Sequence, residues 1–145
     1  MIKKKGLIIF DLDGVIINSE KNMEYAWNNT SKKIGEKIKF QSYRKFVGLG
    51  FFQILKKLGI PKKKFKKAFF YYNKFSNIYI YKVKLYPGIK NEISKIKKNY
   101  NVALFTSKNK KRVDKILRNF KIKFEKIVTM DDVIKTKPDP EGLLK

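Results

Sequence analysis

Two aspartates with one residue between them, Asp11 and Asp13, follow a short apolar run near the start of the chain. Side chains two positions apart on a strand point the same way, so the two carboxylates are expected to share one side. Two carboxylates held together suit a divalent cation with oxygen ligands, usually Mg²⁺. One could also attack phosphorus as a nucleophile while the other moves protons. The pattern therefore predicts phosphoryl chemistry at the end of a strand.

Two simpler explanations of these aspartates compete with phosphoryl chemistry. An EF-hand loop also begins D-x-D-G, but its fifth and sixth positions need an oxygen ligand and then a glycine. This chain has Val15 and Ile16 there, which excludes a calcium loop. A polar turn after the strand stays open as the alternative.

Two later features could act with the aspartates. Thr106 and Ser107 end a second apolar run, and their hydroxyls could donate hydrogen bonds to a phosphate oxygen. Lys137 follows a third run in the sequence KTKPDP, where Pro138 and Pro140 stiffen the loop that presents its ammonium. Taken singly, each could be an ordinary strand-end or surface residue. Because open α/β sheets place ligands at the carboxyl ends of their strands, we expect all of them to converge on one edge.

The elements that must position these residues are indicated by hydrophobic patterning. Three short, continuous apolar runs, at residues 6–10, 102–106 and 126–130, are typical of buried parallel strands. The intervening segments PGIKNEISKIKKNY and KNKKRVDKILRNFKI carry apolar residues at helical spacing. This strand–helix–strand order predicts an α/β layered sheet.

Residues 19–84 follow a different pattern, which predicts a helical insertion. Ser19 is a plausible N-cap for a helix that reaches about Lys33, and FFQILKKLGI indicates a second short helix. A longer segment from residue 62 has aromatic residues at helical spacing, although its end, NIYIYKVKL, alternates and could be a strand. The expected organisation is a core made of residues 1–18 and 85–145, with residues 19–84 inserted.

The sequence resembles the haloacid dehalogenase-like (HAD-like) hydrolase superfamily. FDLDGV is similar to the first motif of that superfamily, LFTSK to the second and KPDP to the third, and the resemblance covers essentially the whole chain. The insertion resembles the helical cap of the phosphoglycolate phosphatase and β-phosphoglucomutase branch, and RKFVGLG is similar to a loop of phosphoglycolate phosphatases. The resemblance implies an α/β, Rossmann-like parallel sheet with an inserted α-helical cap.

The resemblance also implies roles for individual residues. Asp11 would attack the substrate phosphorus and form an aspartyl-phosphate. Asp13 would protonate the leaving alcohol and then activate water. Thr106, with Ser107 beside it, would bind the phosphoryl group, and Lys137 would neutralise its charge. Mg²⁺ would be held by the Asp11 carboxylate and the Asp13 backbone carbonyl.

One part of the family pattern is not found in these 145 residues. The fourth motif, a pair of acids after the next strand that completes the Mg²⁺ site, has no counterpart, and Asp131 and Asp132 precede the KPDP loop and cannot replace it. The sequence thus resembles a truncated member whose C-terminal strands are missing and whose first strand is an unpaired apolar edge. We expect weak Mg²⁺ affinity and little turnover from this chain alone.

Several functions remain open at this point. The resemblance implies a phosphatase for a small phosphorylated metabolite, such as phosphoglycolate. A sugar-phosphate mutase of the β-phosphoglucomutase type is a close alternative, because the same motif residues serve both reactions. An inactive remnant, or a protein that only binds anions, is a third possibility.

The charge balance raises nucleic acid as a partner. The chain has 36 Lys and Arg against 12 Asp and Glu. Only three of the basic residues are arginine, the residue that nucleic-acid sites favour, and lysine is spread along the whole chain. This distribution favours compositional drift toward the residues of A/T-rich codons over a nucleic-acid site.

Other compositional features bear on the surroundings of the protein. The chain has no cysteine, which fits a reducing compartment, and no apolar run approaches the roughly 18 residues of a membrane span. Its start, MIKKKGLIIFDLDG, resembles a signal peptide in having basic residues before an apolar stretch. Asp11 ends that stretch before it is long enough for the apolar segment of a signal peptide. We expect a cytoplasmic protein with no membrane partner.

Overall fold

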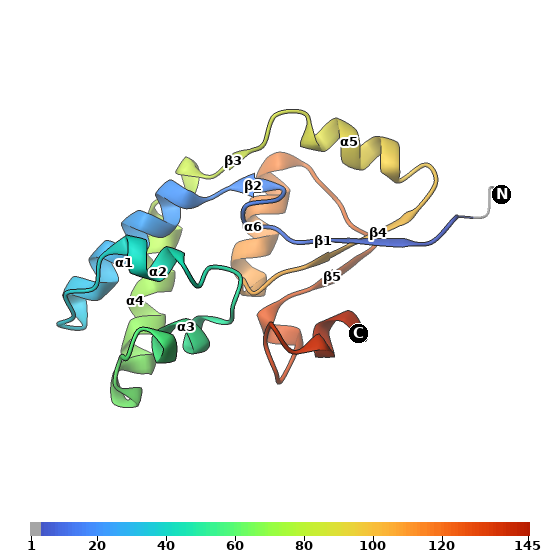
Figure 1. Ribbon diagram of the computed structural model, residues 1–145. Coiled ribbons are helices and arrows are strands. Elements are labelled where there is room, and N and C mark those ends of the chain that lie inside the picture. Colours follow the sequence, from blue (N-terminus) through green and yellow to red (C-terminus); the bar gives the residue numbers. More distant parts are fainter. Residues whose placement is uncertain (1–3) are drawn as a thin grey trace. The chain divides into compact units, whose positions relative to one another are not determined.

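The computed structural model describes residues 4–145, which form two compact units (Figure 1). One unit comprises the chain up to Asn18 together with Lys84–Lys145, and the other is Ser19–Val83. The expected boundaries differ from this division by one residue, and residues 1–3 of the expected core lie outside the described part. The two units are called the core and the insertion below.

The core holds a parallel three-stranded sheet in the order β1-β4-β5, which confirms the predicted α/β class. Its strands are β1 (Leu7–Phe10), β4 (Asn101–Phe105) and β5 (Lys126–Val128). The central strand β4 is buried from its second residue to its last. Phe10 pairs with Leu104, so the chain leaves β1 at Asp11 beside the end of β4.

Strand β1 departs from the prediction of three buried strands. Leu7 and Ile9, two residues apart and therefore on one face of the sheet, are 58% and 39% exposed. Within the described residues β1 pairs only with β4 and forms the edge of the sheet. The expected unpaired apolar edge is therefore present. Such edges are templates for pairing with another strand.

Two helices connect the strands of the core. They are α5 (Ile89–Ile96) and α6 (Lys110–Phe120), and both fall in the predicted segments. Helix α5 follows Gly88, whose φ of 78° favours glycine. Helix α6 is capped by Asn109, whose side chain accepts the backbone N–H of Arg112 at 3.0 Å.

A small antiparallel sheet closes the core where the chain leaves for the insertion and returns from it. Strand β2 (Ile17–Asn18) pairs there with β3 (Lys84–Leu85), and the Tyr86 N–H donates to the Ile16 carbonyl at 3.1 Å. The sequence did not predict this sheet, since strands of two residues are too short to show periodicity.

The insertion is helical. Its α-helices are α1 (Glu20–Lys33), α2 (Phe40–Arg44), α3 (Phe51–Lys57) and α4 (Phe65–Ile78). Ser19 takes the predicted N-cap position of α1, but its side chain makes no capping hydrogen bond. Helix α2 was not predicted, because five residues span little more than one turn.

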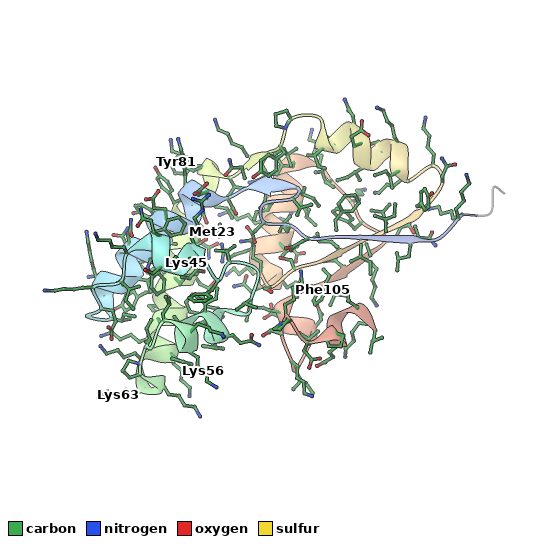
Figure 2. The ribbon with its side chains drawn as sticks, in the orientation of Figure 1. Met23, Lys45, Lys56, Lys63, Tyr81 and Phe105 are labelled. Carbon is green, nitrogen blue, oxygen red and sulfur yellow. The ribbon has the colours of Figure 1, made fainter. Side chains whose placement is uncertain are left out.

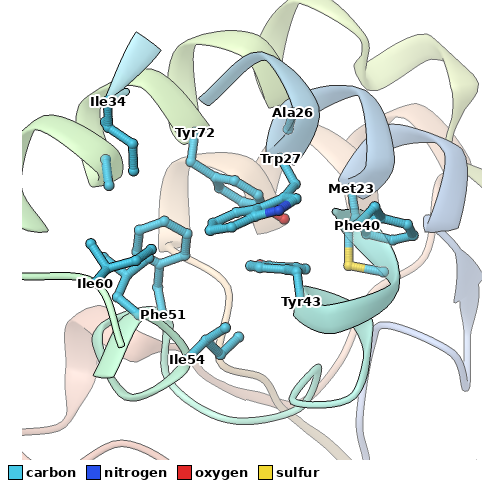
Figure 3. Close-up of a cluster of buried hydrophobic side chains, with 12 residues drawn as sticks. Met23, Ala26, Trp27, Ile34, Phe40, Tyr43, Phe51, Ile54, Ile60 and Tyr72 are labelled. Atoms are coloured by element: carbon cyan, nitrogen blue, oxygen red, sulfur yellow. The ribbon is translucent and has the colours of Figure 1, made fainter. Parts of the chain in front are cut away.

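Helices α1 and α4 pack closely, and an aromatic core is formed by side chains from these two helices together with α2 and α3 (Figure 3). Trp27 is fully buried, its ring stacks on that of Tyr43 with centroids 4.5 Å apart, and its Nε1 donates to the Ile38 carbonyl at 2.9 Å. The buried cluster is Met23, Ala26, Trp27, Ile34, Phe40, Tyr43, Phe51, Ile54, Leu55, Ile60, Ala68 and Tyr72.

The possible strand in NIYIYKVKL is wrong for most of that segment. Helix α4 continues through Ile78, and Ile80–Lys82 form a short 3₁₀-helix, so only Lys84–Leu85 are extended in a strand. Ile80 and Val83 are the buried residues here. Their spacing of three fits a 3₁₀ turn, whereas the alternation in sequence suggested a period of two.

Much of the positive charge lies on the surface. Lys45, Lys56 and Lys63, for example, are exposed residues of the insertion (Figure 2). None of the helices formed within residues 4–145 combines the length and the apolar character needed to cross a bilayer.

Candidate active site

A tight loop after β1 presents the two predicted carboxylates. Leu12 is fully buried, and its carbonyl accepts the N–H groups of Ile16 and Ile17, each at 3.0 Å. Gly14 supplies the left-handed turn at φ 78°. The Oδ1 atom of Asp11 accepts the Leu12 N–H at 2.7 Å, which fixes that carboxylate against the loop backbone.

Lys137 reaches Asp11, as the sequence predicted. Its Nζ lies 3.3 Å from Asp11 Oδ1 and donates to the Phe105 carbonyl at 2.9 Å. The same ammonium lies 4.4 Å from the centroid of the Phe105 ring (Phe105 is labelled in Figure 2). The end of β4 thus holds the lysine of the loop after β5 against the aspartate that follows β1.

Thr106 lies at the same edge but is not bonded to Asp11. It is buried, its N–H donates to the Val128 carbonyl at 3.0 Å, and its Oγ1 accepts the Lys108 N–H at 3.2 Å. Because Oγ1 acts as the acceptor there, the hydroxyl proton stays available for an incoming oxygen. Ser107 follows it in the chain and is half-buried.

Lys108 is the residue of this site to which the sequence assigned no role. Its side chain is only 4% exposed, and its Nζ lies 3.1 Å from Asp13 Oδ1. Burial and the nearby Arg112 lower the pKa of Lys108 to about 8, although Asp13 and Asp11 act in the opposite direction. Lys108 belongs to the LFTSK motif, but burial cannot be recognised for one lysine in a chain so rich in lysine.

The lowered pKa gives a testable pH dependence of stability. The unfolded chain binds the Lys108 proton up to its ordinary pKa of 10.5, whereas the folded chain releases it near 8. Between these pH values the unfolded state binds more protons than the folded state, so the unfolding free energy should rise with pH. The rise should be about 3 kcal/mol larger for the wild type than for Lys108→Met, which lacks the ammonium. Urea unfolding of both proteins in EDTA measures this difference. A difference that stays flat across this pH window would contradict it.

The loop that carries Lys137 is closed by Glu141. The Glu141 carboxylate accepts the N–H groups of Ile134 and Lys135 at 3.0 and 2.8 Å, and these bonds lower the pKa of Glu141. The loop should therefore loosen as pH falls through that lowered pKa. The next residue, Gly142, packs its backbone against the Phe105 ring that lies beside Lys137.

A methyl group at position 142 should disturb this arrangement. In Gly142→Ala the new Cβ would overlap the Cζ and Cε2 atoms of Phe105, a residue that is itself buried. We expect a loss of about 1–3 kcal/mol in unfolding free energy, as for other overpacked sites. Chemical denaturation measures it, with Leu144→Ala as the control because Leu144 is 85% exposed. Equal unfolding free energies of the two variants would show that the Phe105 ring can move away from the added methyl group without cost.

The carboxylates of Asp131 and Asp132 accept hydrogen bonds from nearby residues. Asp132 accepts the N–H and the hydroxyl of Thr129 at 2.8 and 2.7 Å, and these bonds lower the pKa of Asp132. Asp131 accepts the Lys110 N–H at 2.7 Å. The capping by Thr129 also ends β5 at Val128, two residues before the predicted end.

The donors present at this edge are of the kind that Mg²⁺ takes. Asp11 and Asp13 offer carboxylate oxygens, and Asp13 also offers a backbone carbonyl. Within residues 4–145, no three side chains of His, Cys, Asp or Glu gather to form a fuller ligand set. Mg²⁺ commonly takes one or two carboxylates and completes its shell with substrate phosphate and water, so the chemistry of these donors fits the ion.

The core is thus an α/β unit whose strand ends gather two carboxylates and two ammonium groups. The family model described as haloacid dehalogenase-like hydrolase matches residues 8–145. The chain therefore belongs to the haloacid dehalogenase-like hydrolase family.

The chain is also similar to individual proteins. The chain is 32% identical to a phosphoglycolate phosphatase of Aquifex aeolicus, over 96% of this chain and 67% of that protein. It is 27% identical to the pyrophosphatase PpaX of Bacillus cereus, over 98% and 67%. A solved hydrolase from Pseudomonas syringae shares the fold, with a TM-score of 0.88 at 22% identity over 98% of this chain and 68% of that one. The chain thus spans about two thirds of the length of these relatives.

Proposed function

We propose that this chain carries the phosphoryl-transfer site of a phosphatase that acts on a small phosphorylated metabolite resembling phosphoglycolate. The observation that supports this most is the pairing of each carboxylate with its own cation. Lys137 lies 3.3 Å from Asp11, and Lys108 lies 3.1 Å from Asp13. An arriving phosphate monoester is an anion, so a carboxylate can approach it only where fixed cations offset the repulsion.

The proposed reaction has two steps. In the first, an Asp11 oxygen forms a bond to phosphorus and the ester P–O bond breaks. Asp13 enters this step as the neutral acid, gives its proton to the leaving alkoxide, and is left as the carboxylate beside Lys108. In the second, water attacks the phosphorus of the aspartyl-phosphate while Asp13 accepts the water proton. Inorganic phosphate leaves, and Asp11 and Asp13 return to their starting states.

The other residues would bind and orient the phosphoryl group. Lys137 is held in place by the Phe105 carbonyl and ring, so its charge is already positioned before substrate arrives. Thr106 would donate its hydroxyl proton to a phosphoryl oxygen, with Ser107 as a second donor. The Asp11 carboxylate and the Asp13 carbonyl would hold Mg²⁺, which supplies positive charge against the phosphoryl oxygens when it is bound.

The choice of substrate class rests on the relatives. One is named a phosphoglycolate phosphatase and the other a pyrophosphatase, and the identity is higher for the former. Pyrophosphate is therefore the second substrate to test. The mutase alternative is tested with β-glucose 1-phosphate, because the residues of this site would serve both reactions.

The deciding experiment is covalent trapping on the 145-residue chain, since slow turnover is expected from the sequence. The chain is incubated with 2-phosphoglycolate, pyrophosphate or β-glucose 1-phosphate, with Mg²⁺ or with EDTA, and its intact mass and phosphate release are measured. We expect Mg²⁺-dependent addition of one phosphoryl group, bound to Asp11 and cleaved by hydroxylamine. No labelling by any of these compounds, together with no Mg²⁺-dependent binding of beryllium fluoride, would favour a non-catalytic anion-binding protein.

A further inference from the structure

A concave site lies in the core, outside the residues assigned to phosphoryl transfer. It is a groove of about 570 Å³ between α5, the end of α6 and the segment that follows α6 (Figure 1 labels both helices). The lining residues are Lys90, Ile93, Ser94, Lys97, Leu117, Arg118, Lys121, Ile122 and Lys123.

The groove is far more basic than the chain as a whole. Five of its nine lining residues are Lys or Arg and none is acidic, whereas 36 of all 145 residues are Lys or Arg. None of these five cations takes part in an ion pair with another described residue. Positive charge around a concave surface focuses the local field, so the groove should attract anions more strongly than the rest of the surface.

The groove also has an apolar floor. Ile93, Leu117 and Ile122 are buried, while four of the five basic residues around them are exposed. An anion without an apolar part, such as phosphate, would make no hydrophobic contact with these three residues. A ligand that joins an aliphatic part to an anionic group would use both features.

One wall of the groove is already fixed. The Lys97 ammonium donates to the Lys123 carbonyl and lies 5.7 Å from the centroid of the Phe124 ring. These contacts tie the end of α5 to the segment after α6. A wall that is ordered before binding lowers the entropic cost of binding.

We propose that this groove binds a small amphipathic anion, in which a short aliphatic chain carries a phosphate or carboxylate group. Its volume lies within the range of about 300–1,000 Å³ that small-molecule sites occupy. It contains no aromatic residue on which a base could stack and only one arginine, which disfavours nucleic acid. Its concave shape disfavours a flat membrane surface. The proposal is independent of the phosphatase function.

The probes are hexylphosphonate, which a phosphatase cannot hydrolyse, methylphosphonate, which lacks the aliphatic chain, and hexanol, which lacks the charge. Titrations of the ¹⁵N-labelled chain are followed by NMR at about 0.15 M salt, where exposed charges more than about 8 Å apart are largely screened. Hexylphosphonate should shift the amides of Ile93, Leu117 and Ile122 and bind about tenfold more tightly than either other probe. Shifts confined to the loop of Asp11 and Asp13 would report the candidate active site instead and would overturn the groove proposal.

A pair of variants separates local recognition from general charge. Lys90→Gln with Arg118→Gln removes two cations of the groove. Lys98→Gln with Lys115→Gln removes two exposed cations that do not line it. The first double variant should weaken hexylphosphonate binding about tenfold and the second less than about twofold. Equal weakening by both, no hexylphosphonate shifts in the groove, or tighter binding of a short single-stranded RNA to the same residues would each overturn the proposal.

Discussion

Asp11→Asn is expected to abolish covalent phosphorylation of the chain and to lower any phosphate release by about a thousandfold or more. The side-chain amide is not a nucleophile, so no phosphoryl–enzyme bond can form. The asparagine Oδ1 can still accept the Leu12 N–H that Asp11 accepts at 2.7 Å, so the loop should keep its shape. Intact-mass measurement with acetyl phosphate, a donor with a good leaving group, tests this directly. Undiminished labelling of Asp11→Asn would place the nucleophile elsewhere.

Asp13→Asn is the matched variant, because it removes the second carboxylate and leaves the first. Acetyl phosphate releases a weak base, so its cleavage needs little help from a general acid. Hydrolysis of the aspartyl-phosphate needs a base and should slow by roughly 10²–10⁴. The variant should therefore accumulate phosphorylated Asp11 to a higher level than the wild type. A level as low as that of Asp11→Asn would mean that Asp13 is required for phosphorylation itself.

The parts of the site that the sequence predicted follow from strand order. Asp11, Thr106 and Lys137 each follow an apolar run, and parallel strands bring their carboxyl ends to one edge. This argument needs only the number and direction of the strands. It gives no distances, and the structure shows that Thr106 lies at this edge without bonding to Asp11.

Contacts that depend on packing could not be predicted in the same way. Lys108 is important here because it is buried beside Asp13, and nothing in its sequence position distinguishes it from many exposed lysines. Gly142 matters because the Phe105 ring lies against its backbone, a contact across 37 positions of the chain. Hydrophobic patterns indicate which face of a helix or strand is buried. They do not indicate which side chains of other elements contact that face.

Strand β1 and the segment after α4 show where patterns mislead. A continuous apolar run indicates a strand covered on both faces, yet Leu7 and Ile9, which share one face of β1, are exposed. Alternation in NIYIYKVKL suggested a strand, but most of it completes α4 and a 3₁₀ turn that bury Ile80 and Val83. In both places the tertiary environment, rather than the local period, decides which residues are covered.

Trp27→Ala is expected to be the most destabilising single change in the insertion, at about 3–5 kcal/mol of unfolding free energy. Trp27 is fully buried, its ring stacks on Tyr43, and its Nε1 bonds to the Ile38 carbonyl. The alanine leaves a cavity at the centre of the aromatic cluster and removes the hydrogen bond. Trp27→Phe keeps a ring but loses the donor, so it should cost less. Urea unfolding followed by far-UV circular dichroism measures both variants.

The wild type offers an additional probe of this prediction, because Trp27 is the only tryptophan of the chain and its fluorescence reports on the insertion alone. If the insertion and the core unfold together, fluorescence and circular dichroism should give one midpoint, and Trp27→Ala should lower it for the whole chain. If they unfold separately, circular dichroism should show two transitions, and Trp27→Ala should lower the midpoint of only the transition of the insertion. Phe70→Ala is the control, since Phe70 is 62% exposed on α4 and its loss should change stability by no more than about 0.5 kcal/mol. A Trp27→Ala protein as stable as this control would mean that the cluster around Trp27 does not hold the insertion together.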